Sequence, residues 1–155
     1  NATLYFEDFL TMQYQVQEML RVERIFEVDG IMEEIEAYNP LIPDGQNWKA
    51  TFMLEYGDVA ERKAALARLV GVEDRIYVRV GDGERCYAIA DEDLERATEE
   101  KTSSVHFMRF ELSDSDAAAV RSGAPIAFGA DHENLTCEVI LTDAQRTSLA
   151  ADLAP

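Results

Sequence analysis

The fold class of this 155-residue chain is decided by the stretch Arg75-Ile76-Tyr77-Val78-Arg79-Val80-Gly81-Asp82-Gly83-Glu84-Arg85-Cys86-Tyr87-Ala88-Ile89-Ala90. Two runs rich in apolar, β-branched and aromatic residues flank the turn Gly81-Asp82-Gly83. Glycine and aspartate in a short turn between such runs predict a β-hairpin. Hairpins join antiparallel strands, whereas parallel strands need a long crossover segment between them. The stretch therefore predicts an antiparallel sheet.

The same pattern recurs on both sides of this hairpin. Residues 126–130 and 135–141 predict a second hairpin around Asp131-His132-Glu133-Asn134. Residues 51–56 and 105–112 are two further strand-like runs. Together with the two arms of the first hairpin, these runs predict a sheet of about six strands.

Helices are predicted beside these strands. Residues 7–28 carry apolar side chains at three- and four-residue spacing, which predicts a long N-terminal helix. Capping residues and glycine stops predict shorter helices at 32–37, 58–71, 91–101 and 113–123 and one that begins at Thr142. Hairpins with helices between and outside them are typical of an α+β fold. No linker divides the chain, so we expect a single α+β domain over residues 1–155.

Composition excludes two classes of partner. The chain has 31 acidic residues against 14 Lys and Arg, which gives a formal charge of −17. Nucleic acids and anionic membranes attract basic surfaces, so we expect neither as a partner. No apolar run reaches the length of a membrane span, and a cytoplasmic location is expected. Asn1-Ala2 resembles a cloning remnant joined to a natural chain that has been truncated at its N-terminus.

The sequence contains one candidate metal site. It has only two histidines, so a transition-metal site would combine His106 and His132 with a carboxylate from Asp131, Glu138 or Glu111. Two histidines and one carboxylate are a common ligand set for iron, but no two of these ligands share a short motif on one element. The alternative is that His106 is a core-edge histidine bonded to a neighbour. The sequence leaves both interpretations open.

The predicted N-terminal helix is the candidate interaction surface. Heptad-like positions carry Val16 in one row and Tyr5, Met12, Met19 and Phe26 in another. Because apolar residues occur on more than one face of this helix, we expect it to be covered on two sides. We expect a homodimer through helix 7–28, with packing on the chain's own sheet as the alternative.

Long motifs in the chain resemble a known bacterial family. They are Tyr14-Gln15-Val16-Gln17-Glu18-Met19-Leu20-Arg21-Val22-Glu23-Arg24-Ile25-Phe26, Ala37-Tyr38-Asn39-Pro40-Leu41-Ile42-Pro43-Asp44-Gly45, Tyr87-Ala88-Ile89-Ala90-Asp91-Glu92-Asp93-Leu94-Glu95-Arg96 and Lys101-Thr102-Ser103-Ser104-Val105-His106-Phe107. Over nearly its whole length the chain resembles the family catalogued as domain of unknown function 3501. The resemblance implies no activity and no catalytic residues. It implies a longer, Arg-richer N-terminal segment in other members.

The resemblance also implies a physiological setting. Genes of such members often lie beside genes for rubrerythrin-like proteins and iron–sulfur oxidoreductases, which implies a role in redox or peroxide physiology and an electron-transfer protein as partner. We therefore expect a cytoplasmic binding or accessory protein. The alternative hypothesis is a metal-dependent or redox-linked enzyme that uses His106, His132 and nearby carboxylates.

Overall fold

Two antiparallel sheets of four strands each form the body of the molecule in the computed structural model, which describes residues 1–153. Sheet A has the strand order β1-β2-β6-β5, and sheet B has the order β4-β3-β7-β8. The expectation of about six strands in one sheet is therefore wrong. Residues 2–7 form a strand that the helical pattern of the following residues concealed, and the predicted strand 84–90 is divided between the two sheets.

Sheet A is built from strands that alternate between a buried and an outward face. Its members are β1 (Ala2–Glu7), β2 (Asn47–Leu54), β6 (Val105–Glu111) and the short β5 (Ile89–Ala90). Along β2, Trp48, Ala50 and Phe52 are buried, whereas the residues between them are half-buried. This period of two directs one face toward sheet B and the other toward the N-terminal helices.

Sheet B contains both hairpins that the sequence predicts. The first pairs β3 (Ile76–Val80) with β4 (Arg85–Tyr87), and the second pairs β7 (Ile126–His132) with β8 (Leu135–Ile140). Strand β3 also pairs with β7, so the two hairpins lie side by side. Both hairpin predictions are confirmed.

The core lies between the two sheets. Trp48 and Phe110 are fully buried, and the ring of Phe128 packs against both, with centroids 5.8 and 5.1 Å away. The Trp48 indole N–H donates to the carbonyl of Leu149, 2.8 Å away. This bond satisfies the one polar atom of the buried indole and ties the C-terminal helix to the core.

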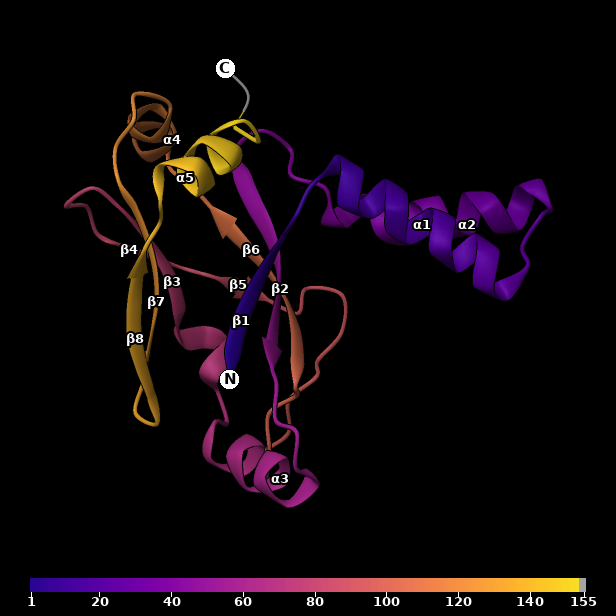
Figure 1. Ribbon diagram of the computed structural model, residues 1–155, viewed down its shortest axis with the longest axis horizontal. Helices are drawn as coiled ribbons and strands as arrows, with labels where there is room; N and C mark the ends of the chain where they lie inside the picture. The colour runs from indigo at the N-terminus through magenta and orange to yellow at the C-terminus, as the bar shows by residue number, and fades with distance from the viewer. Residues whose placement is uncertain (154–155) are drawn as a thin grey trace.

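The chain forms five α-helices within residues 1–153. The helices are α1 (Phe9–Glu23), α2 (Val28–Tyr38), α3 (Val59–Arg68), α4 (Asp114–Arg121) and α5 (Asp143–Ala150), with short 3₁₀ helices at Asn39–Leu41 and Val72–Arg75. Helices α4 and α5 cover one end of the body, α3 covers the other, and α1 and α2 project away from it (Figure 1). No helix in this part of the chain combines the length and apolarity that a membrane span requires.

Two helix predictions are wrong. The predicted helix 7–28 is replaced by the end of β1, the shorter helix α1 and a turn. Helix α1 ends at Glu23 because Arg24 adopts a left-handed backbone conformation with φ 58°. The predicted helix 91–101 is a loop. Asp91 does not cap a helix, because its backbone is also left-handed (φ 52°) and its carboxylate binds groups on β6 instead.

Candidate interaction site

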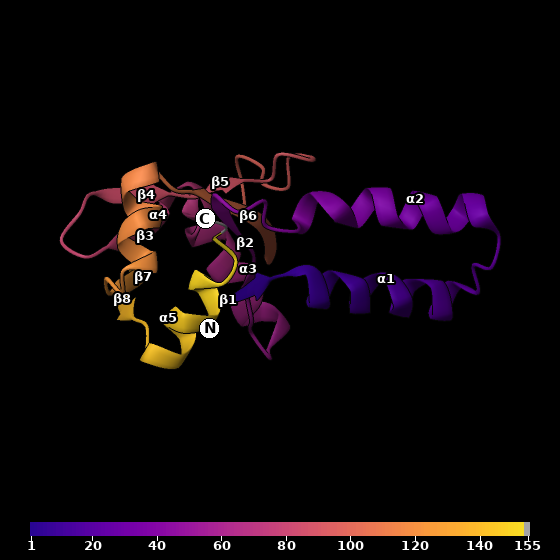
Figure 2. The same cartoon turned by 90° about the horizontal axis from the view of Figure 1, so that it is seen from above.

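Helices α1 and α2 form an antiparallel hairpin that extends well beyond the two sheets (Figure 2). Its start is fixed by Asp8, whose side chain accepts from the Thr11 N–H at 2.7 Å while the Thr11 hydroxyl accepts from the Asp8 N–H at 2.8 Å. This reciprocal cap satisfies amides that a helix start leaves unpaired. Gly30 lies against Ile25 where the chain turns into α2, and a Cβ there would come within 2.7 Å of the Ile25 methyl group. The hairpin is therefore specified by local sequence.

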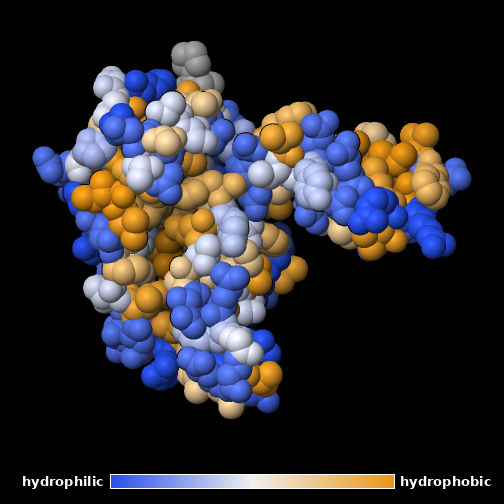
Figure 3. Space-filling model, viewed as in Figure 1, coloured by the Kyte–Doolittle hydropathy of each residue, from blue (hydrophilic) through white to orange (hydrophobic). Residues whose placement is uncertain are grey.

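Large apolar side chains remain exposed on this hairpin. Met12 is the one buried residue of α1, and α2 has none. Phe26 is 78% exposed and Val28 71%. The other exposed apolar side chains of the hairpin are Phe9, Leu10, Tyr14, Val22 and Met32. Figure 3 shows apolar patches near the base and toward the far end of the hairpin, with hydrophilic surface between them. Large exposed apolar side chains gathered on one projecting element indicate an interaction surface.

An open apolar groove of about 810 Å³ lies at the base of the hairpin. Its floor is the outward face of sheet A, with Tyr5, Met53 and Phe107, and one wall is the start of α1, with Leu10 and Tyr14. This α1 segment, residues 9–17, carries no charged side chain, although residues 9–38 as a whole contain seven acidic and two basic residues. Apart from Glu7, which also lines it, the groove offers an uncharged surface on a strongly acidic protein.

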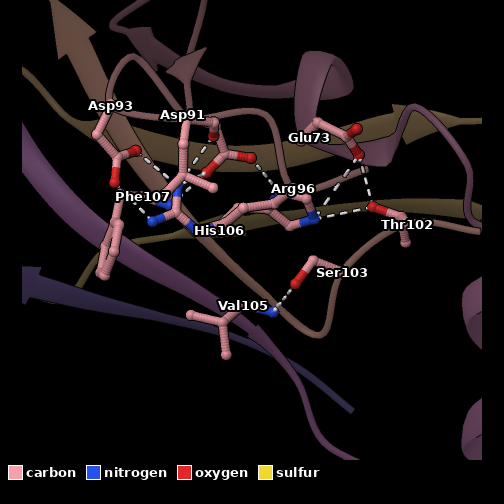
Figure 4. A network of polar contacts seen from close by, with 10 residues as sticks. Glu73, Asp91, Asp93, Arg96, Thr102, Ser103, Val105, His106 and Phe107 are labelled. Carbon is pink, nitrogen blue, oxygen red and sulfur yellow. Dashed lines mark hydrogen bonds and ion pairs between the residues drawn. The ribbon is translucent and has the colours of Figure 1, made fainter. Parts of the chain in front are cut away.

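A second feature of interest is a buried polar network around His106 (Figure 4). The His106 ring is fully buried, with Nδ1 2.6 Å from the Asp91 carboxylate and Nε2 2.8 Å from the Thr102 hydroxyl. The Thr102 hydroxyl donates its one proton to Glu73 at 2.8 Å, so its oxygen can only accept from Nε2–H. The two ring nitrogens therefore face Asp91 on one side and Thr102, backed by Glu73, on the other.

The loop after β5 completes this network at the surface. Asp91 also accepts from the Phe107 N–H at 3.0 Å and from Arg96 at 3.1 Å. The Arg96 guanidinium lies over the Phe107 ring at 4.6 Å and holds the pKa of Asp93 at about 2 by hydrogen bonding to it. The network thus fastens the 91–101 loop to the groove floor, of which Phe107 is part.

The four predicted metal ligands occupy different surroundings. His132 contacts the Val70 carbonyl through Nε2 and accepts from the Asn134 N–H through Nδ1. Asp131 binds Arg85 and Tyr87, and Glu138 binds Arg79 and Tyr77. The structure therefore does not give these residues a common partner or bring them around one point. Within residues 1–153, no group of three His, Cys, Asp or Glu side chains is arranged to hold a metal ion.

The carboxylates of sheet B give a prediction for acid pH. Hydrogen bonds from Arg79 and Tyr77 lower the pKa of Glu138, and a hydrogen bond from Tyr87, with Arg75 and Arg85 nearby, lowers that of Asp131. A carboxylate with a lowered pKa in the folded state stabilises the fold above its unfolded pKa, and this contribution is lost as pH falls through the folded value. We expect the free energy of unfolding to fall below about pH 4.5.

Urea unfolding at several pH values measures this loss. Glu138→Gln removes one of the titrating groups, so the wild-type protein is expected to exceed the variant in stability at neutral pH and to approach it near pH 3. A difference between the two proteins that stays constant over this range would contradict the assignment.

The chain matches a family model over residues 1–153, and the model is described as a protein of unknown function (DUF3501). The chain belongs to the DUF3501 family. It is similar to a novel protein of unknown function from Burkholderia pseudomallei K96243, whose crystal structure was determined at 1.90 Å resolution. The two are 52% identical, with a TM-score of 0.91 over 99% of this chain and 80% of that one. No curated protein matches.

Sequence reasoning missed most of the His106 network in this DUF3501 protein. The sequence pattern predicted Asp91 as a helix cap, Glu73 lay in no motif, and Thr102 lay in a motif of the family resemblance that implied no role for it. One signal was available, since His106 shares its strand face with apolar residues and so was expected to need a polar partner in the core. That partner is Asp91, which lies 15 residues before His106 in the chain. Residue spacing alone did not indicate this contact.

Proposed function

We propose that this DUF3501 protein is a binding or accessory protein whose recognition element is the α1–α2 hairpin with the groove at its base. The observation that carries the proposal is the exposure of the hairpin's apolar side chains, which reaches 78% at Phe26. Helices of 15 and 11 residues are marginal by themselves and gain stability from burying an apolar face. A partner that covers this face would supply the missing burial.

The partner we propose is a second copy of the chain. The groove lies at the base of the hairpin, and Val22, Phe26 and Val28 lie near its far end. A 15-residue helix spans roughly 22 Å, so the end of a hairpin cannot reach its own groove. Two hairpins packed antiparallel about a two-fold axis would place each apolar end in the other copy's groove. The uncharged segment 9–17 limits like-charge repulsion between the two copies to Glu7 in the groove and the acidic residues of the hairpin end, Glu23, Glu27 and Asp29.

Charge substitutions on exposed apolar residues test this dimer. Tyr14→Glu in the groove and Phe26→Glu at the hairpin end are each expected to weaken dimerisation roughly a hundredfold, about 2.7 kcal/mol, because each buries an unpaired charge. Light scattering across the micromolar range measures the mass. Val59→Glu makes the same change at a 53% exposed residue of α3 and is expected to leave the dimer intact.

A charge pair provides the decisive control. In the proposed dimer Tyr14 of one copy faces the hairpin end of the other, so Tyr14→Glu combined with Phe26→Lys is expected to recover part of the affinity. A wild-type protein that remains monomeric at every concentration tested would refute the dimer. Val16, on one of the predicted heptad rows, is half-buried and would report on hairpin stability instead.

The physiological setting stays a prediction. A role in redox or peroxide physiology, an electron-transfer partner and a cytoplasmic location follow from the family resemblance and from composition. The proposed dimer depends on none of them.

A further inference from the structure

A second pocket, of about 450 Å³, adjoins the groove on the outward face of sheet A. Tyr38, Pro40 and Leu41 line it from the end of α2 and the 3₁₀ helix that follows. Lys49 of β2 and Arg109 of β6 line it from the sheet. The volume is in the range of small-molecule sites, so the pocket can accommodate a small organic ligand.

Lys49 and Arg109 are an unusual pair of neighbours. They lie directly opposite each other where β2 pairs with β6. Like charges in this position destabilise a sheet. The chain has 14 Lys and Arg against 31 acidic residues, so its composition does not force two cations together. A local arrangement that costs stability is typical of a functional site.

The carboxylates near this pair bind Arg109 and leave Lys49 without a direct partner. The Arg109 guanidinium donates to Glu92 at 2.8 and 2.9 Å and also to Glu111. Glu7, opposite Lys49 on β1, accepts instead from a threonine hydroxyl of β2 at 2.8 Å. Within residues 1–153, the Lys49 ammonium makes no hydrogen bond and no ion pair.

The half-buried position of this ammonium favours its uncharged form. Burial lowers the pKa of Lys49, and the neighbouring Arg109 guanidinium lowers it further. Glu92, Asp44 and Glu111 act in the opposite direction but do not cancel the shift. A lowered pKa raises the fraction of free amine at neutral pH, and the free amine is the nucleophile.

The surroundings of Lys49 determine which electrophile fits. The Arg109 guanidinium is occupied by two carboxylates and Asp93 borders the pocket, so this guanidinium is not available to an anionic ligand. Aromatic and apolar side chains supply the rest of the wall, with Tyr38, Leu41 and Phe107. An uncharged aromatic electrophile matches both features. An aldehyde is the simplest such group, because it condenses with an amine and releases only water.

We infer that Lys49 is a covalent binding site for a small, uncharged aromatic aldehyde. The ammonium first loses one proton to solvent. The electron pair of Nζ then attacks the carbonyl carbon and forms the C–N bond. The two remaining Nζ protons pass to the carbonyl oxygen, which leaves as water, so that an imine remains. This site does not depend on the proposed dimer, and it is tested by labelling rather than by mass, so either can fail without the other.

Reductive trapping with benzaldehyde and cyanoborohydride tests this site in the whole protein. Cyanoborohydride reduces the imine to a stable benzylamine, which peptide mapping by mass spectrometry locates. The chain has three lysines, of which Lys63 and Lys101 are exposed. At neutral pH, Lys49 is expected to be labelled roughly fivefold faster than either of them. Its rate is expected to saturate with benzaldehyde concentration because a pocket fills, whereas the rates at the exposed lysines rise linearly.

Unfolded protein and a charge-preserving variant are the first controls. In urea the three lysines are expected to be labelled at similar rates, because the pocket no longer exists. Lys49→Arg keeps the positive charge but forms no imine, and it is expected to lose the saturating label. A preference for Lys49 that persists in urea would overturn the proposal, because local sequence rather than the pocket would then cause it.

Two pocket variants test the role of the surroundings, with folding checked by circular dichroism. Arg109→Gln removes the cation beside Lys49 and frees Glu92 to pair with it, so labelling is expected to slow roughly fivefold. Arg68→Gln makes the same change on the exposed surface of α3 and is expected to keep the wild-type rate. Tyr38→Ala is expected to raise the half-saturating benzaldehyde concentration roughly fivefold.

Two results in folded wild-type protein would overturn the proposal. One is labelling of Lys49 no faster than that of Lys63 and Lys101. The other is a rate at Lys49 that rises linearly up to the solubility limit of benzaldehyde, because Lys49 would then be a reactive amine without a binding site.

Discussion

Asp91→Ala is expected to lower the free energy of unfolding by about 3–4 kcal/mol, the largest effect predicted for a single residue of this protein. The carboxylate holds the His106 ring at 2.6 Å, the Phe107 N–H at 3.0 Å and Arg96 at 3.1 Å. Its removal leaves Nδ1 of the buried His106 ring and the Phe107 N–H without this partner inside the protein. Alanine also tolerates the left-handed backbone at φ 52° less well than aspartate does.

Chemical denaturation measures this loss, and Asp91→Asn is the matched variant. Asparagine adopts the left-handed conformation readily and its one oxygen can still accept from the Phe107 N–H, whereas the charge and the second acceptor oxygen, which faces His106 Nδ1, are lost. We expect a cost of about 1–2 kcal/mol for this variant. If the free energy of unfolding of the Asp91→Ala variant lies within about 0.5 kcal/mol of the wild-type value, the network does not stabilise the fold.

Gly129→Ala is expected to cost about 2–3 kcal/mol. A Cβ at this position would lie 2.5 Å from the Tyr77 ring and hydroxyl and 2.6 Å from the backbone carbonyl of Cys137. Tyr77 cannot easily move, because it is 2% exposed and bound to Glu138 at 3.0 Å, with the Arg85 guanidinium 4.4 Å from its ring. The strain would therefore shift β8 relative to β7.

Denaturant unfolding again measures the effect, with Gly57→Ala as control. A Cβ added at Gly57 would have no other atom within 4 Å, so this substitution is expected to change stability by less than about 0.5 kcal/mol. Displacement of β8 should also change the alkylation rate of Cys137 on that strand. A Gly129→Ala protein with wild-type stability would show that the β7–β8 pair adapts freely.

The hairpins and helix caps were readable from the sequence because each depends on residues close together. Gly81-Asp82-Gly83 predicted the β3–β4 turn, and the structure confirms the hairpin. Ser113 and Thr142 accept from the amides three residues later, as their patterns predicted. The family was also recognisable from long motifs. Nothing in these local patterns, however, indicated that residues 84–90 serve two sheets.

The candidate sites depended on contacts that local patterns do not report. The spacing of residues 7–28 predicted an amphipathic helix with apolar residues beyond one face, but the extent of their exposure became visible only once the hairpin was seen to project from the body. The metal hypothesis paired His106 with His132 because they are the chain's two histidines. In the structure, His106 is held by Asp91 and Thr102, whereas His132 contacts the Val70 carbonyl and the Asn134 N–H.

The sequence by itself determined the antiparallel character of the sheets, the turns and most helix starts, because backbone conformation at glycine and capping hydrogen bonds act within about four residues. Only the tertiary structure decided which strand edges stay unpaired, which apolar side chains stay exposed and which carboxylate faces His106. These outcomes follow from packing between segments far apart in the chain. Thr102 and Glu73, for example, meet across 29 residues because sheet A and the segment before β3 share one core.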